Sequence, residues 1–208
     1  MDQPDLSAPE HYINREMSLL AFNRRVLEQA LDPTNPLLER LRFLCISSNN
    51  LDEFFEIRVA GLKQRLELGS DQAGPDGFTV ATQLQSIHAA TMDVVREQAR
   101  CLNEVLLPAM RTAGIELIPR TQWDDETKTW LERYFELEVE PVLSPLGLDP
   151  ARPFPRIQNK SLNFIVRLSG KDAFGRNSNL AIVQAPRSLP RVVPLPNNNG
   201  NVKRIVLL

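Results

Sequence analysis

The stretch NPLLERLRFLCISSNNLDEFFEIRVAGLK covers residues 35–63. Its apolar residues recur at three- and four-residue intervals, the spacing of one face of an amphipathic helix. Asn35-Pro36 supplies a capping residue followed by a proline at the first helical position, a common way for a helix to begin. We therefore predict a helix that begins at this pair and stops near Ser47 or Ser48.

Two serines and two asparagines, SSNN at residues 47–50, lie at the predicted end of that helix. The apolar stripe that follows predicts another helix, which ends at the Gly69 turn. Asn50 can cap this helix while Glu53, three positions later, reaches back as in a capping box. Alternatively, one of the carboxamides faces outward, since an amide carries a donor and an acceptor and can match the edge of adenine. The residues by themselves favour the cap, and the second interpretation stays open.

Further helices flank this stretch on both sides. The segment SLLAFNRRVLEQALD, residues 18–32, has helical spacing, with Ser18 as the expected cap. After the Gly69 turn, the apolar stripe from Val80 to Thr112 predicts a helix of about 50 Å. Residues 1–113 should therefore form an antiparallel helical bundle.

The pattern changes at Gly114. A short strand, IELIP at residues 115–119, leads to a helix that Thr121 can cap and whose first turn is acidic. Proline-rich turns then precede three runs with strand character, SLNFIVRLSG, NLAIVQAP and VKRIVLL. The predicted fold class is α+β, with the helical bundle followed by an incomplete mixed α+β domain at residues 114–208.

The sequence stops inside an apolar run, Ile205 to Leu208, with no polar turn or cap after it. A strand in that position would form a sheet edge that lacks its next partners. We therefore expect the sequence to be a truncated piece of a longer protein.

The composition, 42% hydrophobic and 24% charged residues, is that of a globular protein. No run approaches the roughly 18 apolar residues of a membrane span, and the acidic start lacks the apolar core of a signal peptide. We predict a cytoplasmic protein, with peripheral attachment to a membrane left open. Cys45 and Cys101 lie among apolar residues at helical spacing and are expected to be buried free thiols.

Signatures of catalysis are scarce in this sequence. It has no P-loop, no dinucleotide-type glycine motif, no histidine pair at metal spacing and no serine nucleophile elbow. Gly170-Lys171 is a poor phosphate loop, because the upstream glycine is missing and Asp172 replaces the hydroxyl residue. His11 and His88 have no metal partner or nucleophile nearby in sequence and are expected to be structural or exposed. We therefore predict no catalytic residue and no metal ligand in this chain.

Charge is unevenly distributed along the chain. Residues 1–150 carry an excess of acidic side chains, whereas ten basic residues from 151 onward face only Asp172. Such an excess can steer a polyanion such as polyphosphate or a nucleic acid. A nucleic acid is the weaker prediction, since the chain has no recognition-helix pattern, ribonucleoprotein aromatic motif or zinc knuckle. The ten basic residues are Arg152, Arg156, Lys160, Arg167, Lys171, Arg176, Arg187, Arg191, Lys203 and Arg204.

Three segments together carry a family resemblance. They are YINREMSLLAFNRRVL at residues 12–27, the 35–63 stretch, and SLPRVVPLP at residues 188–196. From the first of these segments to its end, the sequence resembles the long-form bacterial polyphosphate kinases. The most specific parts of the resemblance are the core Ser48–Phe54 and the preceding Arg42–Leu44.

The resemblance implies an enzyme with a helical amino-terminal domain, a head domain and two phospholipase-D-like carboxy-terminal domains. This chain would cover the first domain, residues 1–113, and part of the head domain, residues 114–208. The family reaction is the reversible transfer of the terminal phosphoryl group of ATP to polyphosphate through a phosphohistidine. The resemblance places that histidine, and the ligands of the Mg²⁺ expected in the full-length enzyme, in downstream domains. The piece alone is therefore predicted to be inactive.

The resemblance also assigns one binding residue to this chain. In the family, the first domain forms the roof of the nucleotide site, and the asparagine that contacts ATP matches Asn50. The head domain helps the full-length enzyme to form a homo-oligomer and borders the polyphosphate path, which fits the basic excess after residue 151. ATP or ADP and inorganic polyphosphate are therefore the expected partners.

Two other functions stay open at this point. The helical bundle with the basic α+β segment could be a dimerisation or interaction module without nucleotide binding, in which Asn49 and Asn50 do no more than cap a helix. Self-association that is insensitive to nucleotide would favour that function. Generic nucleic-acid binding by residues 151–208 would instead show an affinity that falls steeply with salt and has no preference for adenine.

Overall fold

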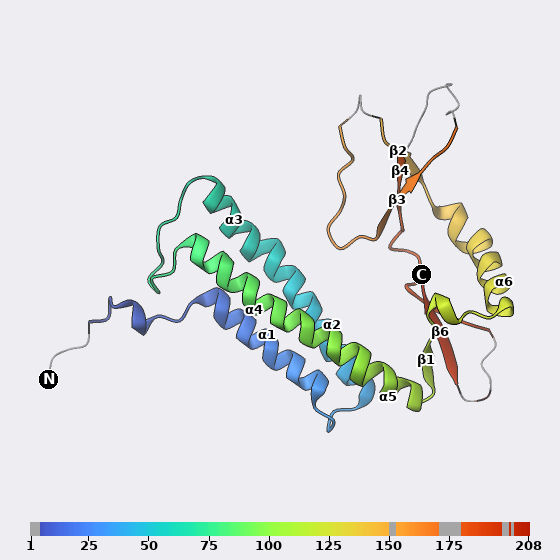
Figure 1. The fold of residues 1–208 in the computed structure, drawn as a ribbon, viewed down its shortest axis with the longest axis horizontal. Helices are drawn as coiled ribbons and strands as arrows, with labels where there is room; N and C mark the ends of the chain where they lie inside the picture. Colours follow the sequence, from blue (N-terminus) through green and yellow to red (C-terminus); the bar gives the residue numbers. More distant parts are fainter. Residues whose placement is uncertain (1–4, 150–152, 171–179, 197–199, 201) are drawn as a thin grey trace. The chain divides into compact units, whose positions relative to one another are not determined.

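The computed structural model describes residues 5–149, 153–170, 180–196, 200 and 202–208. The chain divides into two compact units, and the division falls between Ala113 and Gly114 (Figure 1). Long helices make up the unit before the division, and short strands with one longer helix make up the unit after it. The predicted α+β fold class is confirmed.

The helical unit begins with two helical rods that pack against each other. The first rod is α1, Arg15–Leu31. The second is one continuous helix made of α2, Leu37–Glu53, a π-helical stretch at Phe54–Val59, and α3, Ala60–Glu67. It ends at Glu67, just before the predicted turn at Gly69, where a backbone φ of 73° lets the Ser70 N–H donate to the Arg65 carbonyl at 3.0 Å.

The third rod is also continuous. It comprises α4, Val80–Arg100, a π-helical stretch at Cys101–Leu106, and α5, Leu107–Thr112. The single long helix predicted between Val80 and Thr112 is therefore confirmed. A short 3₁₀ turn at Pro9–His11 precedes the three rods.

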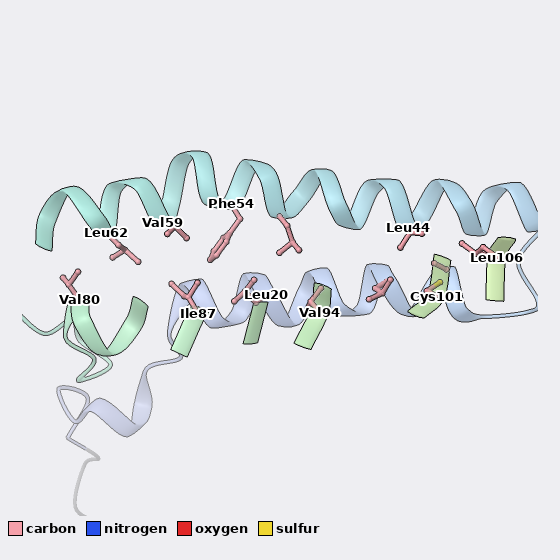
Figure 2. Packing of buried hydrophobic residues seen from close by; sticks show 13 residues of the cluster. Leu20, Leu44, Phe54, Val59, Leu62, Val80, Ile87, Val94, Cys101 and Leu106 are labelled. Carbon is pink, nitrogen blue, oxygen red and sulfur yellow. The ribbon is translucent and has the colours of Figure 1, made fainter. Parts of the chain in front are cut away.

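One apolar core holds the three rods together as an antiparallel bundle. Helix α1 contacts both α2 and α4, and α3 contacts α4. Figure 2 shows Phe54, Val59 and Leu62 pointing from the second rod toward the other two rods. The buried members of this core are Leu20, Leu27, Ala30, Leu44, Leu51, Phe54, Val59, Leu62, Val80, Ile87, Val94, Cys101 and Leu106.

The predicted cap of the first helix is wrong. Asn14, not Ser18, precedes the helix, and its Oδ1 accepts a hydrogen bond from the Met17 N–H at 2.9 Å. The Asn14 Nδ2 also donates to the Asp76 carboxylate at 2.6 Å, which ties the helix start to the loop before α4. An amide can serve both partners at once, whereas the Ser18 hydroxyl lies inside the helix.

The predicted helix end near Ser47 or Ser48 is also wrong. The SSNN segment contains neither proline nor glycine, and asparagine is tolerated inside a helix when its side chain finds a partner. The helical backbone therefore runs on to Glu53 and beyond, and Asn50 caps nothing.

The two cysteines are free thiols in different environments. Cys101 is fully buried, and this burial raises the pKa of its thiol. Cys45 is exposed, so its predicted burial is wrong. It lies one position beyond Leu44, the residue of this turn that enters the core.

The second unit contains two three-stranded sheets (Figure 1). In the first, β6, Lys203–Leu207, lies between β1, Ile115–Leu117, and β5, Val192–Pro194. The pairing of β6 is parallel with β1 and antiparallel with β5. The expectation that the last strand forms a sheet edge without partners is therefore wrong.

The second sheet is antiparallel. Its order is β2, Pro145–Gly147, then β4, Leu180–Gln184, then β3, Asn163–Arg167. Strands β1, β3, β4 and β6 are the ones that the sequence predicted, whereas β2 and β5 were not predicted. Both contain a proline, which the alternation pattern penalises but a sheet edge accepts.

One longer helix, α6, Asp125–Tyr134, accompanies these sheets and continues as a π-helical stretch at Phe135–Val139 and a 3₁₀ turn at Glu140–Val142. The predicted cap, Thr121, is wrong, because it lies in a separate 3₁₀ turn, Arg120–Gln122. Asp124 caps α6, with its Oδ1 accepting from the Thr127 N–H at 2.8 Å.

A small core joins α6 to the first sheet. Its buried members are Ile118, Val193, Leu195 and Val206, against which Trp123, Trp130, Leu131, Tyr134 and Leu208 pack. Trp130 and Tyr134 stack with ring centroids 5.3 Å apart.

Crossing a bilayer requires a helix that is both long and strongly apolar. In the described ranges of the chain, none of the helices meets both conditions.

Candidate functional site

A hollow of about 300 Å³ opens between α1 and the second rod of the helical unit. It lies where α2 passes into the π-helical stretch, so the wall on that side belongs to the SSNN segment and the residues after it. The lining residues are Leu19, Leu20, Phe22, Asn23, Asn50, Leu51, Glu53, Phe54, Ile57 and Arg58.

Two carboxamides lie together in the wall of the hollow. The Nδ2 of the half-buried Asn50 donates to the Oδ1 of Asn23 at 3.1 Å. The Asn23 Nδ2 in turn donates to the backbone carbonyl of Ser47 at 3.0 Å, inside the bundle. Asn23 is 4% exposed and Ser47 is fully buried, so the bond between them is shielded from water, whereas the bond from Asn50 is partly buried.

The network extends to the third rod. The Gln98 Nε2 donates to the Ser47 Oγ at 2.9 Å, which connects α4 to α2. Polar groups inside a bundle are costly unless they are hydrogen-bonded, and these bonds meet that requirement. The three rods are thereby linked by hydrogen bonds directly behind the hollow.

The capping box predicted for the SSNN segment is wrong. The Glu53 carboxylate does not accept from the backbone N–H of Asn50; its Oε1 lies 3.5 Å from the Nδ2 of the exposed Asn49. Asn50 instead uses its donor across the helix interface. Within the described part of the chain, the Asn50 Oδ1 has no hydrogen-bond partner.

The remaining walls are apolar with a charged rim. Phe22 and Ile57 are exposed, Ile57 by 68%, although both are large apolar side chains. The guanidinium carbon of Arg25 lies 5.7 Å from the centre of the Phe22 ring, and the half-buried Arg58 lines the hollow. Apolar surfaces beside a carboxamide suit a flat heteroaromatic group with a polar edge.

The other residues considered for chemistry do not gather around this hollow. His11 lies exposed in the first 3₁₀ turn, and His88 is exposed on α4. Among the described residues, no group of three His, Cys, Asp or Glu side chains comes close enough to hold a metal ion. Gly170 lies at the end of a described segment, and Lys171 and Asp172 lie outside the described residues.

Three of the basic residues after position 151 make local contacts. Arg187 donates to the Asn159 carbonyl at 3.1 Å, and Arg191 donates to the Ala185 carbonyl at 3.4 Å. Arg204 lies 3.8 Å from the carboxylate of Asp124. Arg152, Lys171 and Arg176 lie outside the described residues.

A second hollow, of about 490 Å³, belongs to the α+β unit and was missed by sequence reasoning. It lies between the helix α6 with its π-helical extension and strands β5 and β6. Its walls combine aromatic and aliphatic side chains, among them Trp123, Tyr134, Phe135, Val193 and Leu208. The aromatic spacing from Trp123 to Phe135 was the available signal, but it equally fits a helix packed on a sheet.

Comparison with known proteins identifies the family to which this chain is similar. The family model described as the polyphosphate kinase N-terminal domain matches residues 12–118, and the one described as the polyphosphate kinase middle domain matches residues 126–208. A polyphosphate kinase of Xylella fastidiosa is 55% identical over 190 residues, and one of Pseudomonas aeruginosa is 54% identical over 189. Each alignment covers 91% of this chain and 27% of the relative.

A solved structure of a polyphosphate kinase is also similar to this chain. The crystal structure of polyphosphate kinase from Porphyromonas gingivalis superposes with a TM-score of 0.76 at 29% sequence identity, over 94% of this chain and 28% of that one. The chain thus spans about 27% of the length of the curated relatives it matches. The resemblance found in the sequence is confirmed: the chain belongs to the polyphosphate kinase family.

Proposed function

We propose that this chain is the amino-terminal part of an ATP:polyphosphate phosphotransferase and that it supplies the adenine side of the nucleotide site. The observation that carries the proposal is the position of Asn50, which lines the 300 Å³ hollow and whose Oδ1 lacks a hydrogen-bond partner among the described residues. Asn50 is also the residue to which the family resemblance assigns the contact with ATP.

The size and the chemistry of the hollow support a base rather than a whole nucleotide. Pockets that enclose drug-sized ligands usually measure roughly 300–1,000 Å³. A hollow at the lower end of that range has room for a purine, while the ribose and phosphates extend outward. The exposed Phe22 and Ile57 would cover the faces of the ring, and the Asn50 oxygen would accept from its exocyclic amino group.

The rest of the family reaction is assigned to parts beyond this chain. Transfer through a phosphohistidine needs a nucleophile, cations and groups that clamp the transferring phosphoryl. We propose neither His11 nor His88 for that role, because both are exposed and distant in sequence from Asn50. Mg²⁺ ligands and homo-oligomer formation likewise belong to the full-length enzyme, and the basic residues after position 151 are proposed to border the polyphosphate path.

A nucleotide titration of the 208-residue chain tests the proposal. Backbone amide shifts followed by NMR should change around Ser48–Phe54 and on the α1 side of the hollow, more strongly with ATP than with GTP. Asn50→Ala should weaken ATP binding about tenfold, the usual worth of one hydrogen bond. Asn49→Ala is the matched control, since Asn49 is exposed on the same turn and does not line the hollow. Unchanged shifts at millimolar ATP would reject the proposal for this chain.

The alternative, an interaction module without nucleotide binding, has one observation in its favour. The second hollow is predominantly apolar and includes Trp123, Phe135 and Val193, as protein contact sites often do. Sedimentation velocity with and without ATP separates the two functions. Self-association that ignores ATP, together with unchanged amide shifts near Asn50, would favour the interaction module.

A further inference from the structure

Asn23 is a buried side chain for which the family resemblance gives no role. It projects from α1, is 4% exposed, and makes hydrogen bonds with two different parts of α2. Its Nδ2 donates to the Ser47 carbonyl and its Oδ1 accepts from Asn50. It therefore connects the backbone of α2 with Asn50, the side chain proposed to form a hydrogen bond with adenine.

The direction of these two bonds is fixed by chemistry. A backbone carbonyl can only accept, so the Asn23 amide must turn its Nδ2 toward Ser47. The Asn23 Oδ1 is then the atom that faces Asn50, and an oxygen without hydrogens requires a donor. Asn50 must therefore donate from its Nδ2, which leaves its own Oδ1 as the atom available to a ligand.

The anchor at the beginning of this chain of bonds is rigid. The Ser47 carbonyl is part of the continuous helical backbone of the second rod, and its residue is fully buried. The Gln98 side chain, on α4, donates a hydrogen bond to the Ser47 hydroxyl. Reversing the Asn23 amide would set two oxygens against each other in a shielded site, at the cost of an unmade buried hydrogen bond.

We infer that Asn23 is a positioning residue that orients the Asn50 carboxamide and thereby makes the site prefer adenine over guanine. The inference rests on the proposed function of the hollow. Adenine carries an exocyclic amino group, a donor that the Asn50 oxygen accepts, whereas guanine carries an oxygen at that position, which the Asn50 oxygen repels. A carboxamide that could turn freely would present its NH₂ to guanine instead, so the orientation itself carries the discrimination.

The test compares ATP and GTP dissociation constants of the chain carrying Asn23→Leu, which keeps a similar side-chain shape, and Asn23→Ala. The ratio of GTP to ATP dissociation constants should fall about tenfold in both variants, the effect of one misdirected hydrogen bond. Gln98→Ala is the control, because it removes a bond of the same network and leaves both carboxamides in place. A residue that only stabilised the bundle would weaken both nucleotides equally, and an unchanged ratio in folded variants would overturn the inference.

A measurement without ligand separates this inference from the proposed function. The side-chain NH₂ resonances of Asn50 should show slow rotation and solvent protection in the wild type and in Gln98→Ala, and lose both in Asn23→Leu. If nucleotides fail to bind while this difference is present, the proposed function fails and the positioning stands. If the Asn50 resonances are the same with and without the Asn23 amide, the positioning itself is rejected.

Discussion

Among the described residues, the helical unit buries fourteen apolar side chains and the α+β unit eight, and the largest cluster of each differs more strongly. The core of the helical unit contains thirteen buried residues within the described part of the chain, drawn from all three rods. The core between α6 and the first sheet contains four, supplemented by partly buried aromatic side chains. Apolar burial is the main favourable term in folding. The first unit therefore gains more free energy from its core, which can offset the cost of holding polar side chains in fixed positions.

The two hollows differ in the same way. The hollow of the helical unit has a hydrogen-bonded pair of amides in its wall, fixed by a buried backbone carbonyl. The hollow of the α+β unit is mostly apolar, with charged side chains such as Lys128 and Glu132 among its lining residues. A site that must distinguish similar ligands needs oriented polar groups, and only a well-packed frame keeps such groups oriented.

The largest expected effect is that of Leu27→Ala in the centre of the helical core. Leu27 is 1% exposed and lies among long helices that cannot move independently, so the substitution should cost about 3–5 kcal/mol. Labelling of the buried Cys101 thiol during urea unfolding, in a Cys45→Ser background, reports on this unit. Accelerated labelling without a shift in tryptophan fluorescence is expected, because both tryptophans lie in the other unit.

The matched substitution in the other unit is Leu195→Ala. Leu195 is also buried, but its core is small and bordered by a hollow, so the surroundings can relax and the cost should be about 2–3 kcal/mol. Fluorescence of Trp123 and Trp130 in urea measures it. A cost equal to that of Leu27→Ala would contradict the contrast drawn between the two cores.

Asn14→Ala should have the next largest effect. It removes both the cap of α1 and the bond to Asp76, so a loss of about 1–2 kcal/mol is expected from the helical unit. Ser18→Ala is the control, since Ser18 lies inside the helix and should leave stability nearly unchanged. Cys101 labelling in urea compares the two variants, and equal losses of stability would contradict the assignment of the cap to Asn14.

Asp124→Ala should have the smallest effect, and that effect should depend on pH. Hydrogen bonds from Thr127, together with the charges of Arg204 and Lys128, hold the pKa of Asp124 below its usual value. A carboxyl whose pKa is lower in the folded state stabilises the fold above its unfolded pKa, and this contribution disappears as the pH falls through the folded pKa.

Thermal unfolding between pH 7 and pH 2 checks this prediction. The melting temperature of Asp124→Ala should lie below that of the wild type at neutral pH, and the difference should become smaller in acid. Asp124→Asn retains a capping side chain without the charge and should lose less than the alanine variant. A difference that persists unchanged at low pH would exclude the charged cap as its cause.

Prediction from sequence worked best where a pattern repeats over many residues. The stripe from Val80 to Thr112 gave one continuous helix, and the runs around β3, β4 and β6 gave strands. It failed at single positions where several residues could cap or end a helix. Asn14, Ser18, Asp124 and Thr121 all have capping side chains, and only the path of the backbone selects between them.

The SSNN segment shows the same limit at the candidate site. Its residue types identified the segment as unusual and, through the family resemblance, singled out Asn50. They could not show that the helix continues through it, because the partner that makes Asn50 acceptable there, Asn23, lies 27 positions away on α1. Asn23 itself had no signal in the sequence, because it is one of several polar residues in α1, which also contains Arg24, Arg25 and Gln29.

The sequence by itself determined the family, the α+β class and the helical spacing of the first unit, because these depend on patterns that are local along the chain. Only the tertiary structure decided which amide donates to which, where the hollow opens, and that β6 lies between two other strands. Each of those features joins residues that are far apart in sequence. Such pairs are selected by packing and by the need to satisfy buried polar groups, neither of which a local pattern contains.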